Sequence, residues 1–295
     1  MTTTNNQIIF FGNEQLAQGI KASTPIFDAL IENHYQICAL VLPAARVRKP
    51  FPIAVKAQQA GIPIHYVSKA SELLPIIEQY HPQLGVLAAF GKLVPDSAIN
   101  AIPDGIINIH PSLLPKYRGT TPIESALLNN DQTTGVSIMR LVKAMDAGPL
   151  LAQAEIDITP ETSKQSLYEQ LAAKGTELLL QVLPGALAKN APETAQDEAQ
   201  ATFTAKLDKS QSELKFAEKG AQELVREVVA FAGFPKSKTI LLNKPCTITA
   251  AHAADQATTE LDQLCADGKY FVIDRLLPEN SKEMDAKSFL NGFKK

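Results

Sequence analysis

The first half of the chain alternates short apolar runs with longer stretches of mixed polarity. The apolar runs that we expect to form strands are residues 8–11, 37–42, 64–67, 84–88, 106–109 and 136–141. The stretches that we expect to form crossover helices start at residue 24 or cover residues 52–59, 71–80 and 121–128. Strands that alternate with helices are typical of α/β proteins, so the pattern predicts a Rossmann-like, mostly parallel sheet.

Two of the expected helices carry additional signals. Thr121 is followed by Pro122 at the first helical position and by Glu124 at the third, which is the arrangement of a capped helix start. The stretch 164–188 has leucines at helical spacing, including Leu171 and Leu178. We expect this long helix to close the first domain.

The pattern changes after residue 189. Residues 190–200 are polar or small and include no large apolar side chain, which is typical of a linker. Beyond the linker we expect a helix over 213–231, strands over 239–242, 246–250 and 270–277, and a hairpin turn at Asp267-Gly268. The prediction is therefore a first domain over 1–189, a linker over 190–205 and a mainly β domain over 206–295.

Composition is that of an ordinary globular protein. Of the 295 residues, 45% are hydrophobic and 20% are charged, and the length favours two domains. No apolar run reaches the length of a membrane span and residues 1–7 lack targeting features, so we expect a cytoplasmic protein with no membrane partner. Cys38, Cys246 and Cys265 show neither disulfide nor zinc spacing, and we expect no metal site.

The net charge of −3 argues against broad electrostatic adhesion to nucleic acid. Binding of that kind would have to use local clusters of basic residues. Arg46, Arg48 and Lys49 form one cluster, and Lys236 and Lys238 form another. Clusters of this size are also common in solvated loops, so charge alone leaves both interpretations open.

Polar side chains at the end of one predicted strand suggest chemistry. Asn108 and His110 are two residues apart in a β run, so both project from the same face, whereas Ile107 and Ile109 face the other side. Ligands of open α/β sheets bind at the carboxyl ends of the strands. Asp146 lies on a loop that follows another predicted strand.

An amide, an imidazole and a carboxylate are together suited to acyl transfer. They can stabilise a tetrahedral oxyanion and move a proton without a covalent enzyme intermediate. The alternative is structural: His110 as a satisfied boundary histidine, Asn108 as a turn former and Asp146 in an Asx turn. The residues by themselves leave both interpretations open.

Motifs around these residues resemble those of the 10-formyltetrahydrofolate-dependent formyltransferases. The matching elements are Asn-x-His at 108–110, Ser-Leu-Leu-Pro-x-x-Arg-Gly at 112–119 and Met-Asp-x-Gly-Pro-Leu at 145–150. The likeness covers nearly the whole chain, and the tail Phe-Leu-Asn-Gly at 289–292 is similar to the branch that formylates initiator methionyl-tRNA. The resemblance implies transfer of the formyl group of 10-formyltetrahydrofolate to the α-amine of methionine on that tRNA, for the initiation of translation.

The resemblance also implies a role for each site residue. Asn108 and His110 would donate to the oxyanion, and Asp146 would orient His110 and relay the proton from the amine to the departing N10. The implied folate-binding residues are Phe90, Gly91, Lys92, Leu93, Val94, Ser112, Leu113, Leu114, Pro115 and Val142. The implied tRNA-binding residues are Arg46, Arg48, Lys49, Lys236 and Lys238. We expect a monomer whose C-terminal domain is an OB-like β-barrel that cradles tRNA.

The chain departs from the family pattern in two places. The loop over 43–52 is shorter than the family's usual basic insertion and lacks its glycines. Residues 250–270 hold little strand material, so we expect a trimmed or partly open barrel.

Two other functions fit part of this pattern. A formyltransferase acting on a small amine, such as a nucleotide-linked amino sugar, would keep the same catalytic residues and folate pocket but would not need the C-terminal domain. A non-catalytic tRNA-binding protein would not need Asn108, His110 and Asp146. Turnover of charged initiator tRNA separates these alternatives.

Overall fold

The computed structural model describes residues 7–13, 23–44 and 50–293. The chain divides into two compact units. The first comprises Met1–Pro122, Thr133–Pro160 and Gln165–Thr204, and the second comprises Ile123–Gln132, Glu161–Lys164 and Ala205–Lys295. The second unit therefore includes two short segments from earlier in the chain.

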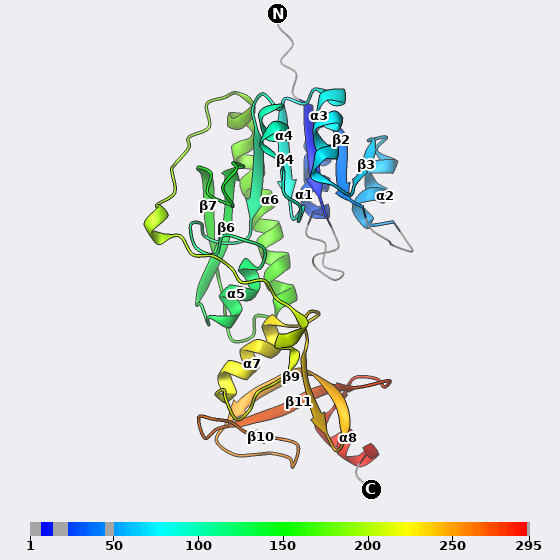
Figure 1. Cartoon of the computed structure of the whole chain (residues 1–295), viewed down its shortest axis with the longest axis vertical. Coiled ribbons are helices and arrows are strands. Elements are labelled where there is room, and N and C mark those ends of the chain that lie inside the picture. Colours follow the sequence, from blue (N-terminus) through cyan, green and yellow to red (C-terminus); the bar gives the residue numbers. More distant parts are fainter. Residues whose placement is uncertain (1–6, 14–22, 45–49, 294–295) are drawn as a thin grey trace, which may run out of the picture. The chain divides into compact units, whose positions relative to one another are not determined.

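A seven-stranded sheet forms the centre of the first unit (Figure 1). Its strands are β1 (Gln7–Gly12), β2 (Gln36–Pro43), β3 (Ile64–Val67), β4 (Leu84–Ala88), β5 (Ile106–His110), β6 (Thr133–Arg140) and β7 (Leu150–Asp157). They lie in the order β3-β2-β1-β4-β5-β6-β7, in which the first five are parallel and the last two are antiparallel to their neighbours. The predicted mostly parallel α/β sheet is confirmed.

Burial explains which strands the sequence predicts. Every residue of β4 and β5 is buried, because a strand covered on both faces needs a continuous apolar run. The edge strand β7 instead alternates between half-buried and exposed positions, and we did not predict it. The alternation of apolar and polar residues from Ala152 to Ile156 was the available signal.

Helices follow most of the strands of the first unit. They are α1 (Thr24–Glu32), α2 (Pro52–Gln59), α3 (Leu73–Tyr80), α4 (Asp96–Asn100) and α6 (Lys164–Leu187). The stretch predicted over 52–59 matches α2, and the one over 164–188 ends one residue beyond α6. The short α4 was not predicted, because five residues are too few to show a helical period. Among the described residues, no helix combines the length and apolar character needed to cross a membrane.

Residues 194–204, here called the strap, belong to the first unit and pair with its backbone, although the sequence predicts a linker. The backbones of Thr194 and Leu150 exchange hydrogen bonds of 2.8 and 2.9 Å. Further along, the Arg118 amide donates to the Thr202 carbonyl, and the Thr204 amide donates to the Arg118 carbonyl, both at 2.8 Å. The strap is therefore fixed near each of its ends.

A curved antiparallel sheet forms the second unit. Its strands are β8 (Ser237–Leu241), β9 (Lys244–Ala254), β10 (Gln263–Leu264), β11 (Tyr270–Pro278) and β12 (Met284–Asp285). The order is β10-β11-β9-β8, with β12 beside β11. The outer strands β8 and β10 do not pair with each other, so the sheet is an open half-barrel. This agrees with the predicted OB-like domain and with its expected opening.

Three helices complete the second unit: α5 (Pro122–Leu128), α7 (Ala221–Ala230) and α8 (Ala286–Phe293). One apolar core joins α7, α8 and the sheet through Leu224, Phe271 and Phe289, all of which have no exposed surface. α5 begins where Thr121 and Pro122 predict it. Arg226 of α7 donates to the Leu128 carbonyl at the end of α5, at 3.3 Å.

The helix predicted over 213–231 is wrong in its first part. α7 starts at Ala221, whose amide donates to the Asp267 carboxylate at 3.1 Å. Gly220 precedes it with an extended backbone and acts as the helix cap. Glu213 instead forms a β-bridge with Lys238. A polar stretch with scattered apolar residues did not reveal this change from extended to helical backbone.

The Asp267-Gly268 turn is a hairpin, as predicted. It connects β10 to β11, and the Cys265 amide donates to the Lys269 carbonyl at 2.8 Å. Gly268 has φ of +75°, a conformation that favours glycine. The two residues of β10 are the only strand between the end of β9 and β11 among the described residues, in line with the expected shortage of strand material.

Candidate active site

Asn108 and His110 lie on the fully buried central strand β5. Their exposed fractions are 7% and 4%. β5 is held between parallel β4 and antiparallel β6, with Asn108 opposite Leu87 on one side and Met139 on the other. The two polar side chains project from the same face of the strand, as its alternation requires.

The side-chain amide of Asn108 makes no hydrogen bond to any residue that the structure describes. Asn108 is 7% exposed, and its amide atoms are not among the side-chain atoms that are fully cut off from solvent. The two N–H groups of Asn108 are therefore available to a ligand, and an oxygen that becomes negatively charged would be a suitable acceptor.

The two ring nitrogens of His110 face different partners. Nε2 lies 2.9 Å from the carbonyl oxygen of Tyr117, and because a carbonyl only accepts, Nε2 carries a proton. Nδ1 lies 3.7 Å from Oδ2 of Asp146, which is beyond hydrogen-bond distance but within reach of an ion pair when the ring is doubly protonated. Nδ1 is therefore the atom at which a proton can be held or released.

Asp146 reaches His110 from a loop that starts at the opposite end of β5. β6 is antiparallel to β5, so its last residue, Arg140, lies opposite Ile107 near the start of β5. The loop 141–149 returns toward the carboxyl end, where the Asp146 carboxylate accepts a hydrogen bond from the Gly119 amide at 2.8 Å. The structure thus brings together the three predicted catalytic residues. Asp146 joins the other two because its loop folds back along the sheet, and not because it follows a strand parallel to β5.

Arg118, next to Gly119, is a buried cation. Its exposed fraction is 2%, and its guanidinium donates to both carboxylate oxygens of Glu198 at 2.7 and 2.8 Å. These hydrogen bonds to the Glu198 carboxylate raise the pKa of Arg118 above its usual value. A buried charge of this kind needs full compensation, and the strap supplies it.

Gln196 of the strap connects Arg118 to the Asp146 loop. Its Oε1 accepts hydrogen bonds from Arg118, and its Nε2 donates to the carbonyls of Asp146 and Gly148 at 2.8 and 2.7 Å. Gln196 and Glu198 were not predicted, because nothing in a polar stretch indicates which of its side chains bind a buried group, and Glu198 itself stays largely exposed. The buried Arg118 in an Arg-Gly pair, which requires a partner elsewhere, was the only indication.

The Ser-Leu-Leu-Pro loop after β5 is held by side chains of β6 and β7. The hydroxyl of Ser137 donates to the Ser112 carbonyl at 2.6 Å and accepts from the Leu114 amide at 3.0 Å. Gln153 donates to the Leu114 carbonyl at 2.8 Å and to the Ser137 hydroxyl at 2.9 Å. Ser137 and Gln153 were not predicted, and β7, which carries Gln153, was not predicted either.

The residues predicted to bind folate differ widely in exposure. Ser112 and Leu114 are buried, and Leu113, Pro115 and Lys92 are half-buried. Phe90 is 1% exposed and packs edge to face on Phe11, with ring centroids 5.6 Å apart. Val94 is also buried, Gly91 is exposed, and Leu93 and Val142 expose 75% and 37% of their surface. The buried members shape the loops, and Leu93 and Val142 offer apolar surface.

The predicted tRNA-binding residues lie in different parts of the chain. Arg46, Arg48 and Lys49 lie outside the described residues. Lys236 and Lys238 lie at the start of β8 in the second unit, and both are exposed.

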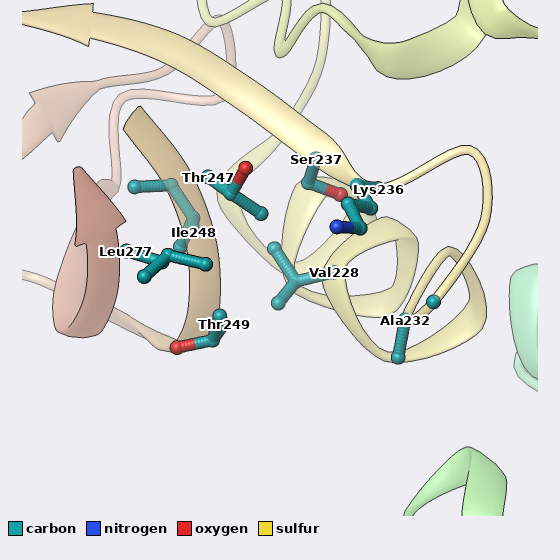
Figure 2. A pocket seen from close by; sticks show the side chains of 9 residues that line it. Val228, Ala232, Lys236, Ser237, Thr247, Ile248, Thr249 and Leu277 are labelled. Atoms are coloured by element: carbon teal, nitrogen blue, oxygen red, sulfur yellow. The ribbon is translucent and has the colours of Figure 1, made fainter. Parts of the chain in front are cut away.

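Lys236 borders a cavity of about 130 Å³ in the second unit (Figure 2). The cavity lies between α7 and the strands β8 and β9, and its walls include Val228, Ile248 and Leu277. Ser237 also lines it, and the Ser237 hydroxyl is buried without a hydrogen-bond partner among the described residues. The cavity contains none of the predicted catalytic residues.

No group of three or more His, Cys, Asp or Glu side chains suited to a metal ion occurs in the described part of the chain. The three cysteines are free thiols, and burial raises the pKa of Cys38 to about 11. A thiol with so high a pKa is a poor nucleophile near neutral pH.

Two family profiles match the chain. The formyl transferase profile covers residues 45–183, and the profile of the formyl transferase C-terminal domain covers residues 206–294. The protein named methionyl-tRNA formyltransferase from Latilactobacillus sakei is 33% identical over 306 residues, which span 97% of this chain and 94% of that protein. The protein of the same name from Methylococcus capsulatus is 33% identical over 304 residues, covering 97% and 96%.

Solved structures with the same fold are more distant in sequence. HypX from Aquifex aeolicus, in complex with tetrahydrofolic acid, matches with a TM-score of 0.69 at 15% identity, over 98% of this chain and 47% of that one. An N-formyltransferase from Helicobacter canadensis, in complex with folinic acid and dTDP-3-aminofucose, matches with a TM-score of 0.68 at 16% identity, over 91% and 98%. At these identities the likeness concerns the fold.

Proposed function

Because this chain belongs to the methionyl-tRNA formyltransferase family, we propose that it transfers a formyl group from 10-formyltetrahydrofolate to the α-amine of methionyl initiator tRNA. The observation that carries the proposal is the unpartnered Asn108 amide beside His110 and Asp146 on the buried end of β5. A hydrogen-bond donor placed next to a proton-handling pair is what attack of an amine on a formyl carbon requires.

Each of the three side chains has one task in this proposal. The Asn108 amide donates to the formyl oxygen as that oxygen becomes negatively charged. His110 keeps Nε2 bonded to the Tyr117 carbonyl and holds or releases a proton at Nδ1. The Asp146 carboxylate, 3.7 Å from Nδ1, stabilises the doubly protonated ring and helps to move the proton from the attacking amine to the departing nitrogen.

10-Formyltetrahydrofolate is a substrate here, and it supplies the formyl group. We propose that its ring system lies along residues 90–94, 112–115 and 142. The exposed side chains of Leu93 and Val142 would cover an apolar face. Gly91, with φ of +70°, leaves its backbone open for a polar edge of the ligand.

The tRNA partner and the domain boundaries are also proposals. We propose that residues 1–189 carry out catalysis, that 190–205 connect, and that the OB-like domain over 206–295 binds tRNA with Lys236 and Lys238. Lys236 and Lys238 are both exposed and close in sequence, which suits contact with phosphates. We further propose that the protein is a cytoplasmic monomer.

The test is direct formylation. The full chain is incubated with 10-formyltetrahydrofolate and methionyl initiator tRNA, methionyl elongator tRNA or a nucleotide-linked amino sugar in parallel. Formylation of the initiator tRNA well above the other two supports the proposal. Turnover of the amino sugar without turnover of tRNA would instead identify a small-amine formyltransferase, and no turnover with any acceptor would reject the enzyme.

Charge reversal of Lys236 and Lys238 to Glu is expected to weaken tRNA binding. Each lost phosphate contact should reduce the slope of log affinity against log salt concentration by roughly one, because fewer counterions are released. Folate affinity should not change. Filter binding across a salt series measures the slope, and Lys174→Glu on α6 serves as the matched charge control. An unchanged slope would remove the two lysines from the tRNA interface.

Activity is expected to survive a strong chelator once the tRNA is kept folded. The proposed chemistry uses an amide, an imidazole and a carboxylate, none of which needs a metal ion. Initial rates with and without EDTA, at constant polyamine concentration, measure this. Loss of turnover that zinc alone restores would contradict the proposed mechanism.

A further inference from the structure

We propose that Gln196 is a positioning residue for Asp146, so that the strap forms part of the active site. The inference rests on the proposed formyl transfer and adds to it a residue outside the Asn-x-His, Ser-Leu-Leu-Pro and Met-Asp elements. Gln196 lies 50 positions from Asp146 in the chain and contacts its backbone.

The hydrogen-bonding capacity of the Gln196 side chain is fully used. Nε2 donates its two protons to the carbonyls of Asp146 and Gly148, at 2.8 and 2.7 Å. Oε1 accepts from Nε and from one terminal nitrogen of Arg118, at 3.2 and 2.8 Å. A primary amide offers two donors and one oxygen with two lone pairs, so no position is left open.

Arg118 determines which way this amide points. A guanidinium only donates, so Oε1 must face Arg118 and the NH₂ group must face the two carbonyls. Arg118 cannot turn away, because it is 2% exposed and bonded to both oxygens of Glu198. Gln196 is thus locked between a buried cation and the Asp146 loop.

The two carbonyls that Gln196 binds flank Ala147, so the contact clamps one turn of the loop. Asp146 has φ of +49°, a left-handed conformation that a residue with a Cβ seldom adopts without support. With that backbone fixed, the Asp146 carboxylate reaches the Gly119 amide at 2.8 Å and stands 3.7 Å from His110 Nδ1.

The strap also holds the other side of the Asp146–Gly119 hydrogen bond. The Thr204 amide donates to the Arg118 carbonyl, directly before Gly119, at 2.8 Å. The Thr204 hydroxyl accepts from the Thr121 amide at 3.3 Å. The strap therefore positions both the donor and the acceptor of this hydrogen bond. Its proposed role is to hold the Asp146 carboxylate in place.

Gln196→Glu in the full chain tests the proposal. Glu keeps the size of Gln and an acceptor for Arg118, but it presents carboxylate oxygens to the two carbonyls in place of donors. We expect kcat to fall roughly 10-fold to 100-fold, as for residues that orient a catalytic group, with KM for both substrates changed less than about threefold. An unchanged kcat would overturn the proposal.

A double variant separates positioning of Asp146 from general damage. If Gln196 acts through the Asp146 carboxylate, Gln196→Glu should have little further effect in an Asp146→Asn background. Multiplication of the two single effects would mean that Gln196 acts elsewhere, and the proposal would fail.

The hydrogen exchange of the Gly119 amide gives a readout that does not depend on activity. This amide donates to Asp146 Oδ2, so releasing the loop should accelerate its exchange by roughly 10-fold or more. Gln200→Ala is the matched control, because Gln200 lies in the same strap and its side chain contacts Asp197. Unchanged Gly119 exchange in Gln196→Glu would overturn the proposal. Gln196→Met, which loses donors and acceptor without adding charge, replaces Gln196→Glu if that variant does not fold.

Two outcomes distinguish the proposed formyl transfer from the proposed role of Gln196. If the wild-type protein does not formylate methionyl-tRNA but Gln196→Glu accelerates the exchange of the Gly119 amide, the proposed function fails. The conclusion that Gln196 positions the Asp146 loop then stands. If the wild-type protein is active but Gln196→Glu changes neither kcat nor the exchange of the Gly119 amide, the proposed function stands and the proposed role of Gln196 fails.

Discussion

Turnover of the His110→Ala variant is expected to be roughly 100-fold to 1,000-fold below that of the wild type, and Asn108→Ala is expected to lose a similar amount. Asn108→Ala removes the only side-chain amide on β5, which we propose donates to the formyl oxygen. His110→Ala removes Nδ1, which lies 3.7 Å from the Asp146 carboxylate and at which we propose that a proton is exchanged. Single-turnover rates at saturating 10-formyltetrahydrofolate measure the chemical step.

Folate affinity is the control for both variants, since neither side chain is needed for the apolar surface at Leu93 and Val142. Affinity within about threefold of the wild type, together with the loss of rate, assigns the effect to the chemical step. A variant that keeps near full turnover would exclude its residue from the mechanism. Equal losses of rate and of folate affinity would place that residue in substrate binding.

Gly148→Ala is expected to reduce turnover by about 100-fold without altering any catalytic side chain. A Cβ at Gly148 would overlap the carbonyl oxygen of Arg140, a backbone atom that cannot rotate away. The loop must then shift, and Asp146 shifts with it. Steady-state kinetics and the thermal unfolding midpoint of the variant measure the two consequences.

Gly292→Ala is the matched control for this substitution, because a Cβ there meets no atom within 4 Å and the backbone is not left-handed. Normal kinetics in Gly148→Ala would mean that the loop tolerates displacement and that the position of Asp146 is not critical. That outcome would also weaken the role assigned to Gln196, which binds the Asp146 and Gly148 carbonyls of the same loop.

Continuous apolar runs made the central strands predictable. Both faces of β4 and β5 are covered, so neither strand can carry polar residues in its middle without a reason. That same constraint made Asn108 and His110 stand out on a buried strand. The edge strand β7 shows only the weaker alternation of a strand with one covered face, and the extended segment at Glu213 is constrained by its bridge to Lys238, which local patterns do not reveal.

The sequence motifs pointed to Asn108, His110 and Asp146 as candidate catalytic residues, but not to the side chains that hold them. Asp146 reaches His110 only because β6 runs antiparallel and its loop folds back, and strand direction cannot be deduced from an apolar run. The supporting side chain of Gln153 comes from the unpredicted strand β7, and that of Gln196 from a segment 50 positions beyond Asp146. Both side chains retain some exposure, but their amide groups bind loop backbone and, for Gln196, the buried Arg118 guanidinium, which polarity alone does not predict.

Fixing the strap near both ends restricts how chains of this family can change in length. Thr194 is joined to Leu150 and Thr202 to Arg118, so the path between them has a set span. One residue more or fewer within that path would move Gln196 away from Arg118 and the Asp146 loop. Relatives should therefore tolerate insertions and deletions before residue 194 or after residue 204, and the distance from the first strap contact to the second should stay constant among active members.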